Sequence, residues 1–155
     1  MILQQYWGWY EVLKRSLVLV LGVIFLSLLP LPIILFNISN YIYIIILSLL
    51  EIIISFFFSI IGTAVTFKKA NMDNTLKGAV SAVILYIGHV IGSIITGLSP
   101  DYKVLVEKIS TQLGSDIQIV SPLAINSLIT SFLIFLLLGS FAGWLTKRLS
   151  GVRNG

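Results

Sequence analysis

The chain has 155 residues, of which 57% are hydrophobic and only 10% charged, and its mean hydropathy is +1.05. Soluble domains are about 45–50% apolar and about 25% charged, so this composition excludes a soluble globular fold. The high apolar content also excludes a disordered chain. The composition predicts a polytopic integral membrane protein.

The chain lacks cysteine and has a single histidine, His89. The lack of thiols excludes disulfides and thiolate metal sites, and one histidine is too few for the three or four ligands of a typical zinc site. No nucleophile-elbow or phosphate-loop motif is present either. We therefore expect a non-enzymatic protein that holds neither a metal nor a cofactor.

Four stretches have roughly the 20 apolar residues that a helix needs to cross a bilayer core about 30 Å thick. They cover about residues 16–36, 41–67, 78–98 and 122–145. Short connections make the first three spans an up-down-up set of neighbours. The predicted fold is an all-α bundle of four transmembrane helices, forming one domain over residues 1–155.

The basic residues indicate how this bundle is oriented. Lys103 and Lys108 would lie on one side of the membrane, and the other eight of the 10 lysine and arginine residues would lie on the opposite side. By the positive-inside rule, this asymmetry predicts a multi-pass protein of the cell membrane with both termini in the cytoplasm. It also accounts for the net charge of +4 without a nucleic-acid partner.

Aromatic residues lie near the predicted membrane surface. Trp7 and Trp9 precede the first span and Trp144 ends the fourth, positions where tryptophan anchors helices at the headgroups. Residues 2–13 would form a short interfacial helix or an extension of the first span. A partner-binding role for this cluster is the alternative to simple anchoring.

The segment between the third and fourth spans predicts a further helix, over about residues 100–113. Ser99, Pro100 and Asp101 form a typical helix start, and apolar residues then recur at helical spacing as far as Leu113. The helix would be amphipathic and lie on the outer surface of the membrane. It would either cover its own bundle or provide a docking surface for another subunit.

Small residues at four-residue spacing predict close helix packing. On the third span Gly88 is followed by Gly92, and Ser93 by Gly97, while the fourth span has Gly139 and Gly143. Such positions let backbones approach closely, but the spacing does not say whether the facing helix belongs to the same chain.

The second span carries a stripe of polar residues, namely Ser48, Ser55, Ser59 and Thr66, with Glu51 among them. Serine and threonine can bond back to their own helix, so they indicate little alone. A carboxylate deep in the bilayer costs about 3 kcal/mol or more, so Glu51 must face the bundle interior or a wet cavity, find a partner, or remain protonated.

His89 is the natural partner for Glu51. Counting 1.5 Å per residue, Glu51 lies roughly 15 Å below the outer surface and His89 roughly 13–14 Å. We therefore predict a buried pair between the second and third spans, and a possible proton or ion site. The alternative is that each side chain bonds a backbone carbonyl, Tyr86 or Ser93.

Two hypotheses for function follow. The first is a structural or accessory subunit of a larger membrane complex, or a homo-oligomer, whose partners are the lipid bilayer and other membrane subunits or copies of itself. The second is a small oligomeric channel or a proton- or cation-coupled transporter that uses Glu51 and His89. The outer end of the fourth span carries the polar residues Asn126, Ser127, Thr130 and Ser131. For the second hypothesis, these side chains would line a vestibule above Glu51; the alternative is that they bond across the bundle.

Overall fold

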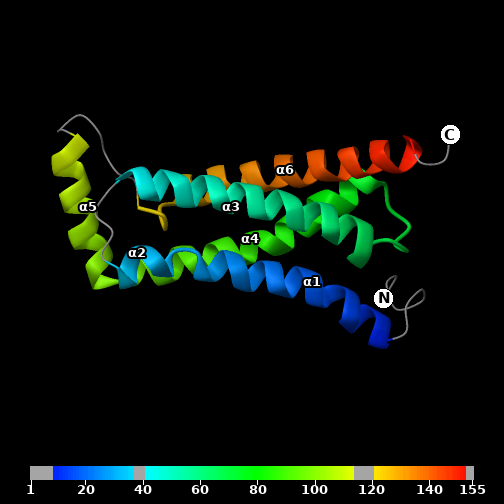
Figure 1. Ribbon diagram of the computed structural model, residues 1–155, viewed down its shortest axis with the longest axis horizontal. Helices are drawn as coiled ribbons and strands as arrows, with labels where there is room; N and C mark the ends of the chain where they lie inside the picture. The colour runs from blue at the N-terminus through cyan, green and yellow to red at the C-terminus, as the bar shows by residue number, and fades with distance from the viewer. Residues whose placement is uncertain (1–8, 37–40, 114–120, 153–155) are drawn as a thin grey trace.

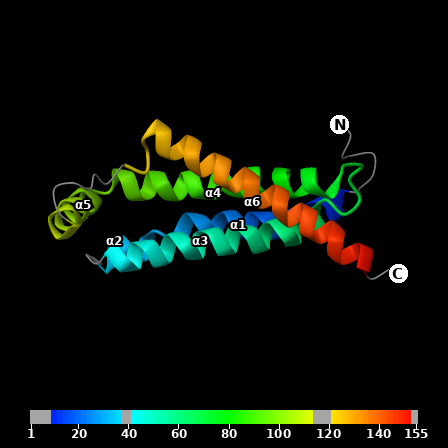
Figure 2. The same cartoon turned by 90° about the horizontal axis from the view of Figure 1, so that it is seen from above.

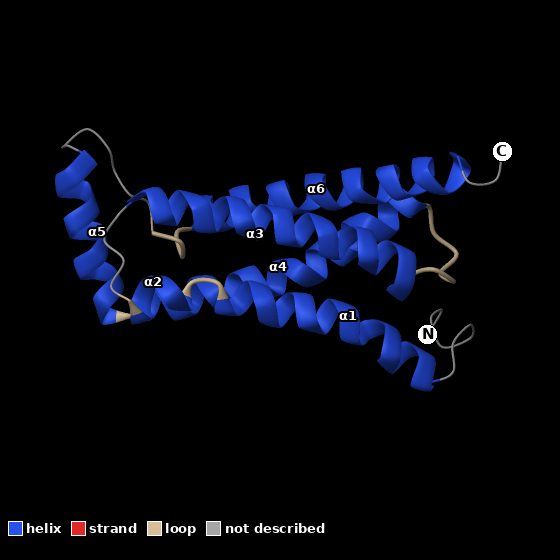
Figure 3. Cartoon of the chain, in the orientation of Figure 1, coloured by secondary structure: helices blue, strands red, loops and turns tan. Residues whose placement is uncertain are grey.

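A computed structural model describes residues 9–36, 41–113 and 121–152, and every regular element in these ranges is helical (Figure 3). The prediction of an all-α bundle is confirmed. Four helical stretches are long and apolar enough to span a membrane: Lys14–Leu35, Ile42–Thr66, Asn74–Leu98 and Ile125–Ser150.

The first span is broken near its end. Helix α1 (Trp9–Leu28) is followed by a turn and the five-residue helix α2 (Leu31–Leu35). Pro30 and Pro32 have no backbone N–H to continue the hydrogen-bond ladder, which explains the break. Residues 9–13 therefore extend the first span, while residues 2–8 and Trp7 lie outside the described part.

The second span ends in a widened turn. Helix α3 (Tyr41–Ile61) continues as a π-helical segment, η1 (Gly62–Thr66). A π turn inside an apolar run leaves no mark on composition, so the sequence did not reveal it.

The third and fourth spans begin away from their predicted starts. Helix α4 (Asn74–Leu98) starts four residues before Gly78 because Asp73 caps it, accepting a hydrogen bond from the Thr75 N–H at 3.0 Å. Lys77, which precedes the predicted start of the third span, is consequently a buried helical residue. Helix α6 (Ile125–Val152) starts three residues after Pro122.

The long helices run side by side, and α4 lies at the centre against α1, α3 and α6 (Figures 1 and 2). Helix α5 (Pro100–Leu113) crosses one end of the bundle, while the start of α1 and the end of α6 lie at the other end (Figure 1). We call these the α5 end and the terminal end.

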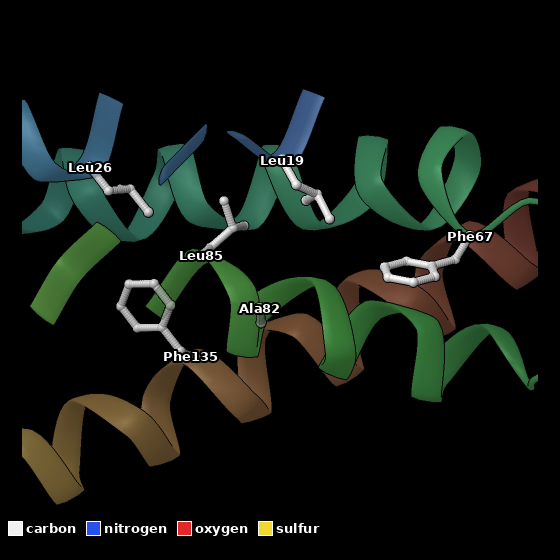
Figure 4. Close-up of a cluster of buried hydrophobic side chains, with 6 residues drawn as sticks. All are labelled: Leu19, Leu26, Phe67, Ala82, Leu85 and Phe135. Atoms are coloured by element: carbon white, nitrogen blue, oxygen red, sulfur yellow. The ribbon is translucent and has the colours of Figure 1, made fainter. Parts of the chain in front are cut away.

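Two apolar clusters hold the arrangement together. The larger joins α1, α4 and α6 through Leu26, Leu85 and Phe135 (Figure 4). The smaller fixes α5, whose Leu105 and Ile109 are each only 2% exposed and pack around Ile33 of α2. Helix α5 therefore covers its own bundle, as one of the two alternatives predicted.

Candidate functional site

Glu51 and His89 contact each other in the interior of the bundle. Oε1 of Glu51 on α3 lies 2.6 Å from Nδ1 of His89 on α4, and each side chain is about one-fifth exposed (21% and 19%). Among the described residues, neither side chain has another hydrogen-bond partner. The structure thus brings the predicted pair together at a depth where ionisable groups are costly to maintain.

Aromatic rings hold the imidazole against α6. The His89 ring lies 5.7 Å from that of Tyr86 and 5.4 Å from that of Phe135, centroid to centroid. The Tyr86 hydroxyl donates to the Leu128 carbonyl at 2.8 Å, which ties α4 to α6. The imidazole is therefore held by packing as well as by Glu51.

The pair forms the floor of a cavity of about 560 Å³ beneath α5, which we call the α5 cavity. No lining residue of α3 or α4 lies closer to the terminal end than Glu51 and His89. Its walls are mostly aliphatic, with a few hydroxyl groups. The main aliphatic residues are Leu29, Ile33, Ile44, Leu47, Leu105 and Ile109, and the hydroxyls belong to Ser48, Ser93, Thr96 and Tyr102.

A second hollow, of about 430 Å³, also reaches His89. We call it the α6 groove. It is lined by His89, Pro122 and Ile134 and by the four polar residues predicted to form a vestibule, Asn126, Ser127, Thr130 and Ser131. His89 and Pro122 line both hollows, and of the two only His89 is ionisable, so its imidazole stands between an apolar compartment and a polar one.

The polar stripe is buried only on the terminal side of Glu51, at Ser55, Ser59 and Thr66, whereas Ser48 lies on the α5 side and is exposed. Most of its hydroxyls bond locally. Ser48, Ser55 and Ser59 donate to carbonyls of their own helix. Thr66 differs, because its hydroxyl donates to the Arg15 carbonyl of α1 at 2.7 Å. The stripe therefore lets helices approach one another and does not form a second charged site.

The predicted glycines pack within the chain. Gly88 and Gly92 face α1, where a side chain at Gly88 would come within 2.5 Å of the Val23 carbonyl oxygen. Gly139 and Gly143 face the start of α4. The atoms nearest to a side chain at Gly97 belong to the side chains of Leu123 and Pro122. Gly78 was not among the predicted glycines, yet a side chain there would overlap the backbone of both Gly139 and Gly143.

Trp144 is the only predicted anchor whose side chain is described. It is 42% exposed near the terminal end, where it stacks on Phe141 and lies 5.4 Å beneath the guanidinium carbon of Arg148. Trp9 lies in the first turn of α1, and Trp7 is outside the described residues.

Two polar contacts at the terminal end were not predicted. Arg15 donates to the Val65 carbonyl of η1 at 3.0 Å, and Lys147 pairs with Asp73 at 3.0 Å. The hydrogen bonds from Lys147 and Thr75 lower the pKa of the Asp73 carboxyl to about 2. Such contacts depend on which helices are adjacent, which the spacing of residues along the chain does not show.

The fold defines a small multi-pass integral membrane protein with four spans. No protein-family model, curated protein or solved structure matches the chain. Within the described ranges, no three His, Asp or Glu side chains gather as a metal site would need. The chemistry that this arrangement offers is proton exchange at Glu51 and His89.

Proposed function

We propose that this protein is a non-enzymatic, proton-coupled transporter whose titrating site is the Glu51–His89 pair. The observation that carries the proposal is the position of the pair: it closes the floor of the α5 cavity, and its imidazole also lines the α6 groove. Intramembrane ionisable pairs of this kind often mark proton or ion pathways.

The two ring nitrogens of His89 give the proton a route. Nδ1 is hydrogen-bonded to Glu51, while Nε2 has no partner among the described residues. Histidine can accept a proton at one nitrogen and release one from the other near neutral pH. A proton taken up at Nε2 from the α6 groove would free the Nδ1 proton to move to Glu51, leaving the imidazole neutral.

The shape of the bundle suggests which side the site serves. The hollows that reach the pair lie toward the α5 end, while Leu19, Phe67 and Ala82 fill the core toward the terminal end (Figure 4). With the terminal end in the cytoplasm, as the basic residues predict, the pair would be loaded from outside. Transport would then require the terminal half to open in a second conformation.

The test is proton movement in liposomes that contain the purified full chain and a pH-sensitive dye. We expect the wild type to carry protons in response to a pH gradient, and Glu51→Gln and His89→Gln to lose this flux while remaining folded. Glu107→Gln, which removes an exposed carboxylate on α5, is the matched control and should behave as wild type. Unchanged flux in Glu51→Gln would refute the proposal.

The second candidate is an accessory subunit or homo-oligomer. It is favoured by α3, whose span is only 11% buried in its own chain, compared with 39% for α4. Because the glycine faces and α5 already have partners within the chain, α3 is the face best placed to contact another subunit. Purification from native membranes in a gentle detergent, with the mass of the intact particle, tests this: stoichiometric foreign subunits would support it, and a lone monomer would oppose it.

A further inference from the structure

We propose that the α5 cavity binds a hydrophobic organic cation, with its positive charge at Glu51 and its apolar body against α2, α3 and α5. This inference rests on the proposed function, because it names the class of solute that would be exchanged for the proton.

The first argument is the chemistry of the walls. Leu47, Leu105 and Ile109 present aliphatic surface, and none of the lining residues is lysine or arginine. The hydroxyls of Ser48 and Thr96 donate to carbonyls of their own helices, which lowers their polarity toward the cavity. An apolar solute body therefore fits these walls. A sugar would leave its hydroxyls unsatisfied there, and a small inorganic ion would lack ligands to replace its water.

The second argument is charge. The titratable groups that line the cavity are Glu51 of α3, His89 of α4 and Tyr102 of α5, and Tyr86 stacks behind the imidazole. Burial raises the pKa of Tyr102, so its phenol stays neutral. Glu51 is thus the only carboxyl among the lining residues, and in its ionised form it would attract a cation and repel an anion.

The third argument is size and access to the carboxylate. A volume of about 560 Å³ lies within the roughly 300–1,000 Å³ of ordinary small-molecule sites. His89 bonds to Oε1 of Glu51, and no described residue donates to Oε2. A cation can therefore reach the carboxylate without displacing His89.

Binding and protonation would exclude each other. A cation pairs with Glu51 only when the carboxyl is ionised, and it disfavours a charged imidazole beside it. One monovalent cation entering would release one proton to the solvent, and a returning proton would expel the cation. Coupling would thus follow from competition for one carboxylate.

The test uses tetraphenylphosphonium, a permanent cation, and tetraphenylborate, an anion of nearly the same size and shape. Equilibrium dialysis with the purified full chain in a mild non-ionic detergent should show that the cation binds more tightly as the pH rises, and at least tenfold more tightly than the anion. Glu51→Gln should weaken cation binding at least tenfold, and Glu107→Gln should not change it.

Ser48→Phe, which would fill the cavity beside Glu51 without removing the carboxyl, should also abolish binding. Equal binding of both ions, or undiminished cation binding in Glu51→Gln, would overturn the inference and indicate a pocket for neutral apolar groups such as lipid chains. The two proposals fail separately. If proton flux depends on Glu51 but no cation binds, only the inference about the solute class is refuted. If a cation binds at Glu51 but no proton flux is seen, the transporter proposal is refuted and the binding site is supported.

Discussion

Asp73 stabilises the terminal end of the bundle in two ways. Its carboxylate caps α4 through the Thr75 N–H, and it pairs with Lys147 of α6. Because these bonds lower its pKa from 3.8 to about 2, the folded protein gains stability from Asp73 above about pH 4. That contribution should be lost as the pH falls from about 4 to about 2, since the carboxyl is then protonated in the folded state too.

Two substitutions separate the cap from the ion pair. Asp73→Asn keeps a side-chain oxygen for the cap but loses the charge opposite Lys147, while Asp73→Ala loses both. We expect the melting temperature at pH 7 to fall from wild type to Asp73→Asn and further to Asp73→Ala, by a few degrees in all. The difference in melting temperature between wild type and Asp73→Asn should narrow between pH 4 and pH 2. A gap that persists at pH 2 would show that the charge of Asp73 is not its cause.

The contact between Glu51 and His89 could be predicted because it depends on two quantities that the sequence contains. One is depth, fixed by the rise of a helix, and the other is adjacency, which the short loop between two spans enforces. The contact of Arg15 with Val65 could not be predicted in this way, because it depends on the π turn of η1. The α5 cavity could not be predicted either, because it depends on where α5 packs against the bundle.

At the level of elements, the closest contact is that of α4 with α6. A side chain at Gly78 would overlap the Gly139 carbonyl oxygen, and one at Gly143 would overlap the Asn74 carbonyl oxygen. Backbone atoms cannot rotate away, so Gly78→Ala must push the helices apart. We expect a loss of about 1–3 kcal/mol in the free energy of unfolding, the usual cost of overpacking, measured by denaturant titration in micelles.

Gly97→Ala is the matched control for this experiment. The atom closest to a side chain there is Cδ1 of Leu123, at 2.8 Å, which can move by rotation. We expect a change within about 0.5 kcal/mol. Equal losses at Gly78 and Gly97 would mean that the spacing of α4 and α6 does not limit stability.

The docking of α5 rests on one face of that helix. Leu105 is 2% exposed and Val104 is 50% exposed, so alanine substitutions at these neighbours compare a docked position with an open one. Leu105→Ala should lower the free energy of local unfolding of α5 by about 2 kcal/mol or more. This corresponds to roughly 30-fold faster amide hydrogen exchange along the helix. Val104→Ala should leave exchange nearly unchanged. Equal rates in the two variants would contradict the packing of α5 on the bundle.

For the whole molecule, the two ends differ in charge. The described basic residues Lys14, Arg15, Lys68, Lys69, Lys77, Lys147 and Arg148 belong to the terminal end, and Lys103 and Lys108 belong to α5 at the other end (Figure 1). Because positively charged segments are retained in the cytoplasm, α5 and the hollows above Glu51 should face outward.

The absence of native cysteine makes this orientation directly measurable, because any thiol introduced is the only one in the chain. Thr111 on α5, Asn71 between α3 and α4, and Ser150 on α6 are all exposed. In intact cells a membrane-impermeant maleimide should label Thr111→Cys, and label Asn71→Cys and Ser150→Cys only after the membrane is opened. The reverse pattern would place the α5 cavity on the cytoplasmic side, so the Glu51–His89 pair would take up its protons from inside the cell.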